Sequence, residues 1–266
     1  MRAKSGDLVV SADAARENLL PSHVPISKVQ KATARTPDST RIYAVGDVHG
    51  RADLLSALLE RVDAHLDAFP ISQPIQVFLG DYVDRGPQSR EVLDLLIERH
   101  RHHNLFCLKG NHEDCAARFL DDPSVLPNWR RMGGINTLLS YGVSAATGDS
   151  PRKQREAAAA FRQALPDSHR QFLQNLALSF TCGDFFFVHA GVRPGVPLGQ
   201  QQEQDLLWIR QDFLLHQDDF GKVVVHGHTP TLEPDVRPNR INIDTGAYAT
   251  GRLTCLVLED NEMCFI

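Results

Sequence analysis

The sequence lacks the features that mark secreted, membrane-spanning or disulfide-rich proteins. Its five cysteines are an odd number and include no CxxC pair, which favours a reducing, intracellular setting. No apolar run in it approaches the roughly 20 residues that a membrane helix needs. The first residues, MRAKSGDLVV, lack the apolar core of about 7–15 residues found in signal peptides. We therefore expect a cytoplasmic protein with no membrane partner.

An excess of basic residues is also absent. The net charge is −5, whereas proteins that bind nucleic acid usually carry a basic face, so we expect no nucleic-acid partner. The 266 residues are 42% hydrophobic and 23% charged, which is typical of a globular protein. A chain of this length has room for a large core and needs no disulfide to hold it together.

Two parts of the chain differ in composition. Residues 1–38 are rich in Ser, Thr and Ala, contain Pro21, Pro25 and Pro37, and show no sustained periodicity. This pattern predicts an N-terminal extension, either flexible or held against the body. Residues 39–266 are expected to form one catalytic domain. Within that domain the pattern of residues 114–180 is mostly helical, and we place this segment near the cleft.

One design recurs from residue 41 onward. Short apolar runs, each ending in a small residue and then Asp, Asn or His, occupy residues 41–47, 76–81, 105–111, 185–191 and 223–228. Short apolar runs of this kind, bounded by glycine, indicate buried strands. Two further runs, 241–248 and 252–259, extend the β-rich C-terminal part.

Helical patterns separate the first three of these strands. Residues 51–69 place their leucines on one face, and residues 89–101 begin with Ser89, a good N-cap. Strand, helix, strand, helix, strand implies βαβ units in an α/β protein. Ligands of such sheets bind beyond the carboxyl ends of the strands, which is where this chain carries its Asp, Asn and His residues.

The polar residues at the five strand ends suit a divalent metal. They are Asp47, His49, Asp81, Asp84, Arg85, Asn111, His112, His189, His226 and His228. Carboxylate, amide and imidazole groups together favour an ion of intermediate hardness such as Mn, Fe or Zn. The set offers more ligands than one ion needs, and a bridging carboxylate would suit a two-metal hydrolytic centre.

Each motif also has a purely structural interpretation. GDVHG could be a turn, GDYVDRG a salt-bridged loop, GNHE a capped helix start and HGH a solvated pair. Packing does not require five consecutive strand ends that each present a metal-competent residue. We therefore interpret the motifs together as one site.

The set of motifs resembles a known family. GDVHG (46–50), GDYVDRG (80–86), GNHE (110–113), HAG (189–191) and GHT (227–229) are similar to the signature series of the phosphoprotein phosphatases. These form a branch of the calcineurin-like metallophosphoesterases, and the bacterial and bacteriophage lambda-type serine/threonine phosphatases are the nearest match. The resemblance covers roughly residues 41–259 and implies a central β-sandwich flanked by α-helices.

The resemblance implies a role for each motif residue. Two divalent ions, with Mn expected and Fe or Zn as alternatives, would be held by Asp47, His49, Asp81, Asn111, His189 and His228. His112 would be the general acid, and Asp84 would orient it. Arg85, Arg210 and Asn111 would contact the substrate phosphate. Water activated by the two metals would then attack phosphorus directly.

Three further residues have weaker signals. His226 stands two residues before His228 and is expected to be structural or to support the ligands. Related enzymes often carry a second ligand two residues after the GHT histidine, but Pro230 occupies that place here, so we expect fewer protein ligands on the first ion. Arg193 is a second candidate phosphate contact, although a surface role fits it better. Asp244 is expected to form a turn or to support a ligand.

The expected activity is metal-dependent hydrolysis of phosphomonoesters, with phosphorylated proteins as the main substrate and small phosphoesters as the alternative. A dinucleotide polyphosphate hydrolase is the chief alternative, because that sister group shares GDxHG and HAG. Asp84 and Glu113 favour the protein phosphatase, since the sister group usually lacks the first and has Asp in place of the second. A broad phosphomono- and diesterase and a non-catalytic phosphate-binding module are further alternatives.

Overall fold

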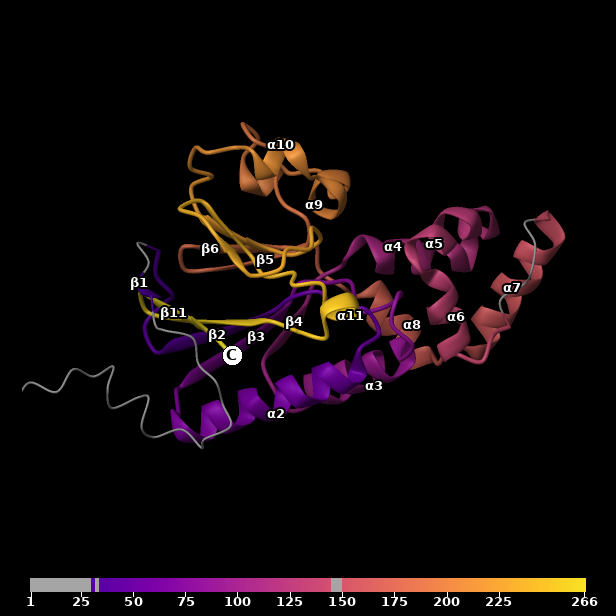
Figure 1. Ribbon diagram of the computed structural model, residues 1–266, viewed down its shortest axis with the longest axis horizontal. Coiled ribbons are helices and arrows are strands. Elements are labelled where there is room, and N and C mark those ends of the chain that lie inside the picture. The colour runs from indigo at the N-terminus through magenta and orange to yellow at the C-terminus, as the bar shows by residue number, and fades with distance from the viewer. Residues whose placement is uncertain (1–29, 32–33, 145–149) are drawn as a thin grey trace, which may run out of the picture.

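The computed structural model describes residues 30–31, 34–144 and 150–266 of the chain. They form two β-sheets that pack face to face, with helices on the outer face of each sheet (Figure 1). The expected β-sandwich flanked by helices is confirmed.

The first sheet contains the strands that precede GDVHG, GDYVDRG and GNHE. Its order is β1 (Gln30–Lys31), β11 (Glu262–Phe265), β10 (Cys255–Glu259), β2 (Thr40–Val45), β3 (Gln73–Phe78) and β4 (Leu105–Cys107). β2, β3 and β4 are parallel, and β10 runs antiparallel to both β2 and β11. Because parallel strands end at the same edge, the three motifs emerge side by side.

The second sheet brings the two C-terminal motifs to the same place. Its order is β5 (Ser179–Cys182), β6 (Phe185–Val188), β7 (Val223–His226), β9 (Arg240–Asn242) and β8 (Asp235–Val236). β6, β7 and β9 are parallel. β6 is buried along its whole length, which explains why its sequence FFFV shows no alternation of apolar and polar residues.

The helices form three groups (Figure 1). α2 (Ala52–Ala68) and α3 (Ser89–His100) connect β2 to β3 and β3 to β4 along the outer face of the first sheet. The segment from GNHE to β5 contains α4 (Asn111–Asp121), η1 (Pro123–Val125), α5 (Leu126–Met132), α6 (Gly134–Ser140), α7 (Pro151–Ala164) and α8 (Asp167–Gln174). The second sheet carries η2 (Leu198–Gln200), α9 (Glu203–Trp208) and α10 (Gln211–Leu214). The short α11 (Ala247–Thr250) connects β9 to β10 of the first sheet, and its Ala247 packs in the cluster on the helical side of that sheet.

The start of α3 differs from its prediction. The N-cap residue is Gln88, and Ser89 is the first residue of the helix. The Ser89 hydroxyl instead accepts a hydrogen bond from the backbone N–H of Asp84 at 3.0 Å. Ser89, which the sequence predicts to be the N-cap of the helix, therefore contacts the GDYVDRG loop instead.

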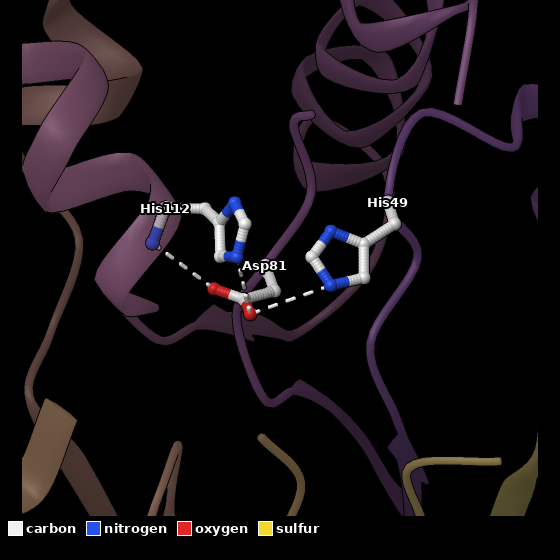
Figure 2. Close-up of side chains that lie close together, drawn as sticks. All are labelled: His49, Asp81 and His112. Carbon is white, nitrogen blue, oxygen red and sulfur yellow. Dashed lines mark hydrogen bonds and ion pairs between the residues drawn. The ribbon is translucent and has the colours of Figure 1, made fainter. Parts of the chain in front are cut away.

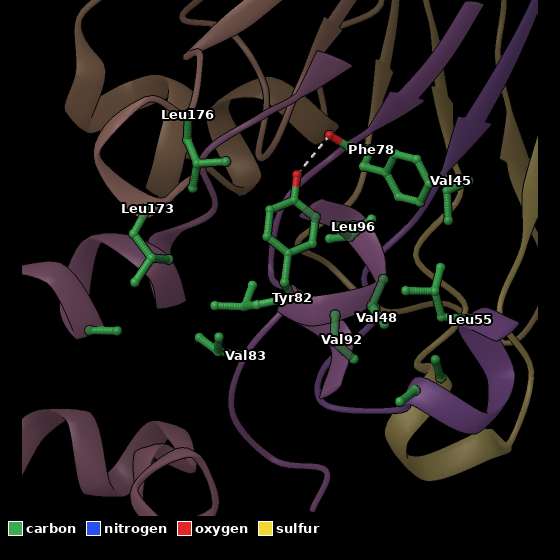
Figure 3. Close-up of a cluster of buried hydrophobic side chains, with 14 of the residues drawn as sticks. Val45, Val48, Leu55, Phe78, Tyr82, Val83, Val92, Leu96, Leu173 and Leu176 are labelled. Atoms are coloured by element: carbon green, nitrogen blue, oxygen red, sulfur yellow. Dashed lines mark hydrogen bonds between the residues drawn. The ribbon is translucent and has the colours of Figure 1, made fainter. Parts of the chain in front are cut away.

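The sheets divide the apolar side chains into separate clusters. In β2, Ile42 and Ala44 face the second sheet, whereas Tyr43 and Val45 face the helices, as the two-residue period of a strand requires. Figure 3 shows part of the cluster on the helical side, where Tyr82 of the GDYVDRG loop lies among the core residues. Its hydroxyl donates to the carbonyl oxygens of Phe78 at 3.1 Å and Leu108 at 2.7 Å, so this loop is anchored in the core.

Part of the expected N-terminal extension contacts the body. β1 pairs with β11, and the backbone N–H of Thr36 donates to the carbonyl oxygen of Asp260 at 2.9 Å. Residues 1–29 and 32–33 lie outside the described residues, and the domain boundary at residue 39 stays a prediction. In the described part of the chain, no helix combines the length and the apolar character needed to cross a membrane.

Two histidines outside the motifs are buried. His65 is 6% exposed and contacts the Tyr43 hydroxyl through Nδ1 at 2.7 Å. His169 is 1% exposed and contacts the Tyr141 hydroxyl in the same way at 2.7 Å. Both partners come from other elements, so the local sequence carries no sign of either pair.

Candidate metal centre

The strand-end residues converge as the sequence predicts. Asp47 and His49 follow β2, Asp81 follows β3, Asn111 and His112 begin α4, His189 follows β6 and His228 follows β7. All seven are at most 5% exposed. A buried group of this composition needs compensation for its charge and for its lone pairs.

Asp81 is the centre of the cluster. One carboxylate oxygen lies 3.5 Å from His49 Nε2 and 3.7 Å from His112 Nε2, and the other lies 3.4 Å from His189 Nε2. Figure 2 shows His49 and His112 on either side of this carboxylate. Although burial acts to raise it, the facing imidazoles hold the pKa of Asp81 below its usual range. An ionised Asp81 that is shared by two groups of ligands has the position of a bridging carboxylate.

The first ligand group consists of His49, Asp81 and His112, whose ligand atoms lie within 4.8 Å of one another. His49 Nδ1 is 3.0 Å from the carbonyl oxygen of Val83, and donation to this oxygen leaves Nε2 free to bind a metal. Burial lowers the pKa of His49 to about 3, so the imidazole is held in the neutral form that acts as a ligand.

The second ligand group consists of Asp81, His189 and His228, and Asn111 adds an amide oxygen. Asn111 Oδ1 is 2.9 Å from both His189 Nε2 and His228 Nδ1, which are 3.1 Å apart. His189 Nδ1 is fixed by the carbonyl oxygen of Leu79 at 3.0 Å. Burial lowers the pKa values of both histidines. Three electron-pair donors that converge in this way fit a divalent cation.

Asp47 follows β2 of the first sheet and contacts residues that follow strands of the second sheet. Its carboxylate accepts the backbone N–H of His228 at 3.1 Å and makes a hydrogen-bonding contact with Asp244. A Cβ atom on Gly227 would lie 2.1 Å from Asp47 Oδ1, so only glycine permits this approach. Burial, followed by the charges of Asp244 and Asp81, raises the pKa of Asp47.

Asp244, which the sequence predicts to form a turn or to support a ligand, is buried beside Asp47. It is 3% exposed, and burial raises its pKa to about 6. Two buried carboxyls in contact cannot both be ionised unless a cation lies near them. The Asp47–Asp244 pair therefore fits a divalent ion on this side of the centre, where Pro230 replaces the additional ligand expected from related enzymes.

Glu113 organises the GDYVDRG loop. Its two carboxylate oxygens accept the backbone N–H groups of Gly110 (2.9 Å), Asp81 (2.8 Å), Tyr82 (2.7 Å) and Val83 (3.1 Å). Every one of these contacts is to the main chain. Glu113 therefore sets the geometry of the loop, and the sequence alone showed only its place at the start of a helix.

His112 forms a buried pair with Asp84. The distance from His112 Nδ1 to Asp84 Oδ2 is 2.7 Å. Burial alone would lower the pKa of His112, but Asp81 and Asp84 raise it above its usual value. His112 Nε2 faces the cluster, 3.7 Å from Asp81 and 3.5 Å from Arg85 Nη2.

Two residues of the helical segment hold Asp84 in place. Trp129 Nε1 donates to Asp84 Oδ2 at 2.8 Å, and Thr137 Oγ1 donates to Asp84 Oδ1 at 2.5 Å. The Thr137 hydroxyl also accepts the backbone N–H of Asp84 at 2.9 Å. No motif surrounds Trp129 or Thr137 in the sequence, and their part in the site was missed.

The arginines occupy three different settings. The Arg85 guanidinium stacks on the ring of Tyr248, 4.6 Å from its centroid. Arg210 is exposed and donates to Thr229 Oγ1 at 3.3 Å, beside the second ligand group. Arg193 forms a two-bond ion pair with Asp205 at 2.5 and 2.8 Å. Arg85 and Arg210 can therefore contact a phosphate, whereas the Arg193 guanidinium is engaged.

Backbone strain is concentrated at the site. Seven non-glycine residues among those described have positive φ: Ser39, His49, Asp81, Asp84, Arg85, His228 and Asp260. Five of the seven are residues that the sequence assigned to the site. Such conformations are disfavoured for residues with a Cβ and persist where the surroundings enforce them.

His226 is structural in its contacts. Its side chain is fully buried, its ring lies 4.9 Å from that of Phe213, and its Nε2 has no hydrogen-bond partner. It belongs to neither ligand group of the described residues. The supporting role expected for His226 stays a prediction.

Comparison with known proteins identifies the family. The family model described as calcineurin-like phosphoesterase matches residues 40–259, so the chain belongs to the calcineurin-like phosphoesterase family. It is accordingly a phosphoesterase of the kind that uses a binuclear metal centre.

Relatives and solved structures show how far the similarity extends. The proteins named bis(5'-nucleosyl)-tetraphosphatase PrpE [asymmetrical] from Halalkalibacterium halodurans and Bacillus subtilis are each 25% identical to this chain. These alignments cover 84% and 79% of this chain and 92% and 87% of the relatives. A crystal structure of a putative diadenosine tetraphosphatase has a TM-score of 0.59 at 20% identity, with 89% of this chain and 97% of that chain covered. A cold-active protein tyrosine phosphatase gives 0.54 at 16% identity, with 92% and 82% covered.

Proposed function

We propose that this chain is a divalent-metal-dependent hydrolase that cleaves bis(5'-nucleosyl) tetraphosphates asymmetrically, into a nucleoside triphosphate and a nucleoside monophosphate. The observation that carries this proposal is the similarity to relatives named for that reaction, which extends over 84% of this chain and 92% of the first relative. The sequence motifs favoured a protein phosphatase, with a dinucleotide polyphosphate hydrolase as the chief alternative. The proposal adopts that alternative.

Glu113 was part of the sequence-based argument for a protein phosphatase. In the structure its carboxylate is occupied by four main-chain N–H groups. It is 1% exposed and cannot reach a substrate. Glu113 therefore stabilises the conformation of the loop, and its presence gives no support for a protein substrate.

The proposed ligand sets are those that the family resemblance implies. The second set is the second group in the structure with Asn111 added, whereas the first set takes Asp47 in place of His112, which is kept as the proton donor. Asp47, His49 and Asp81 would hold one ion, and Asp81, Asn111, His189 and His228 would hold the other. Manganese is the expected metal, with iron or zinc as alternatives, because the donors mix imidazole with oxygen. When bound, the ions supply positive charge that lowers the pKa of a water and neutralises phosphate oxygens.

Arg85 and Arg210 would grip the phosphate chain at two places. Arg85 lies beside His112, and Arg210 lies beside Thr229, next to His228. Planar guanidinium groups form paired hydrogen bonds with phosphate oxygens. Two such groups on different sides of Asp81 suit a substrate that carries several phosphates in a row.

One observation favours a second candidate, the hydrolysis of phosphomonoesters such as phosphoserine in proteins. The buried His112–Asp84 pair is built to donate a proton. A serine alkoxide needs that proton in order to leave, whereas a nucleotide leaves as a phosphate that is already ionised near pH 7, since its pKa is about 6. A strong general acid therefore benefits the phosphomonoester more.

A substrate panel separates the two candidates. Purified protein is stripped of metal, resupplied with Mn²⁺ and offered diadenosine tetraphosphate, a phosphoserine peptide and bis-p-nitrophenyl phosphate. We expect the highest kcat/KM for the dinucleotide, with ATP and AMP as the products separated by chromatography. A higher kcat/KM for the peptide would replace the proposal with the protein phosphatase, and turnover of all three at similar rates would indicate a broad esterase. No turnover of any of them would indicate a phosphate-binding module.

His112→Asn tests the proton donor apart from the choice of substrate. The amide keeps much of the size of the imidazole but cannot act as a general acid near pH 7. We expect turnover of the phosphoserine peptide to fall about 10²–10⁴-fold, the range for a lost general acid, and turnover of p-nitrophenyl phosphate to fall much less. Equal losses on both substrates, with metal content unchanged, would show that His112 has another role.

A further inference from the structure

A shallow pocket lies next to the second ligand group. It has a volume of about 280 Å³ and is lined by residues of α9, α10 and the turn between them, together with Arg193. This volume is below the roughly 300–1,000 Å³ typical of pockets for drug-sized ligands. It is suited to a planar group of the size of a nucleobase.

Trp208 connects this pocket to the proposed metal centre. Its indole ring lies 6.4 Å from the ring of His228 at an interplanar angle of 81°, and it also lines the pocket. Trp208 is only partly buried, whereas Trp129, the second of the two tryptophans in the chain, is fully buried. An accessible indole beside a phosphate-binding centre offers a stacking surface for a base.

The charged groups around the pocket are arranged for a nucleotide. Arg210 lines it and is free of carboxylate partners among the described residues, with Thr229 as its one hydrogen-bond partner. Arg193 and Asp205 neutralise each other through two hydrogen bonds, and Arg193 also lies 3.4 Å from Asp212. Arg210, the cation without a carboxylate partner, therefore lies near His228, where the phosphates of a nucleotide would lie.

Polar groups suited to a base edge are present as well. The exposed side chains of Gln204 and Gln211 line the pocket. Each amide carries both a donor and an acceptor, the pair of groups that can bond bidentately to an adenine. Aromatic, amide and cationic side chains, which suit the stacking face, the edge and the phosphate of a nucleotide, thus line one pocket.

We propose that the pocket formed by Trp208, Arg210, Gln204 and Gln211 binds the base and first phosphate of one nucleoside end of the substrate. The inference rests on the proposed function, because only a substrate with a base needs this pocket. It adds a specificity site that extends from His228 over α9 and α10, with Trp208 as the stacking residue and Arg210 as the phosphate contact.

Adenosine 5'-monophosphate is the probe for direct binding. Added to the Mn²⁺-loaded protein, it is expected to quench the tryptophan fluorescence, whereas ribose 5-phosphate and inorganic phosphate are expected to quench it much less. Trp208→Phe retains a ring but leaves Trp129 as the only indole, so it should abolish the quench. An unchanged quench in Trp208→Phe, or none in the unmodified protein, would overturn the assignment of the pocket.

Kinetics test the same pocket during turnover. Trp208→Leu is expected to raise the ratio of KM for diadenosine tetraphosphate to KM for p-nitrophenyl phosphate by roughly 5- to 100-fold, the range that base stacking contributes. Trp208→Phe should restore most of this loss. Leu215→Ala, at a side chain 73% exposed at the end of α10, is the matched control and should leave the ratio unchanged.

The outcomes separate the pocket from the proposed function. If the protein hydrolyses the dinucleotide but Trp208→Leu does not change the KM ratio, the pocket is wrong and the function stands. If the protein hydrolyses only p-nitrophenyl phosphate and the peptide, the proposed function is wrong. The fluorescence titration with adenosine 5'-monophosphate then decides by itself whether the pocket binds a base.

Discussion

Thr137→Val tests whether the helical segment holds the His112–Asp84 pair. The substitution keeps the branched shape but removes the hydroxyl, which donates to Asp84 Oδ1 at 2.5 Å and accepts the backbone N–H of Asp84 at 2.9 Å. A hydrogen bond to a buried charge contributes about 1.5–3 kcal/mol and an ordinary one about 0.5–1.5 kcal/mol. We therefore expect the free energy of unfolding to fall by about 2–4.5 kcal/mol.

Urea unfolding of the metal-stripped protein measures this change, and Thr181→Val is its matched control. Thr181 is exposed on β5, where such a substitution is expected to change stability by less than about 0.5 kcal/mol. Because Asp84 orients His112, Thr137→Val should also lower turnover of an alkyl phosphate more than turnover of p-nitrophenyl phosphate. A stability change no larger than that of Thr181→Val, together with equal losses on both substrates, would refute this account of Asp84.

Three further predictions concern the metal centre and its rim. Gly227→Ala places a Cβ atom 2.1 Å from Asp47 Oδ1, so elemental analysis of the purified variant should find about one Mn²⁺ fewer per chain. The control is Gly199→Ala, whose Cβ atom would have no heavy atom within 4 Å and which should retain the full Mn²⁺ content. Tyr248→Leu removes the ring under Arg85; at about 0.5–1 kcal/mol for an exposed cation–π contact, KM should rise roughly 2- to 5-fold, and an unchanged KM would show that the ring does not position the guanidinium. Removal of metal by a chelator should lower the unfolding temperature, because the buried carboxylates then lack their counter-charge, and Mn²⁺ should restore it; a temperature that does not respond to Mn²⁺ would contradict the proposed ligand cluster.

The sequence predicted the parts of the site that local pattern encodes. Asp47, His49 and Asp81 each stand directly after an apolar run, and the parallel strands that such runs form must end at one edge. The same argument placed His189 and His228, because β6 and β7 carry the same pattern. Residues of this kind can be assigned from the sequence without knowledge of the tertiary structure.

The residues that the sequence did not assign depend on contacts between distant elements. Trp129 and Thr137 lie 45 and 53 residues beyond Asp84 in the chain, on helices whose packing no local pattern specifies. The burial of His169 has no local signal in the sequence, because its partner, Tyr141, comes from the end of α6. The contact between Trp208 and His228 also forms only in the folded chain, so the sequence alone does not reveal it.

Glu113 has a consequence for the choice of metal ion. Its carboxylate ties Asp81, Tyr82 and Val83 to the first turn of α4, and α4 also carries Asn111. Asp81 and Asn111, the proposed bridging ligand and a proposed ligand of the second ion, are therefore linked through one side chain. If both bind metal, an ion of the wrong radius could not draw Asp81 toward itself without also displacing Asn111, so this link would favour ions of one size.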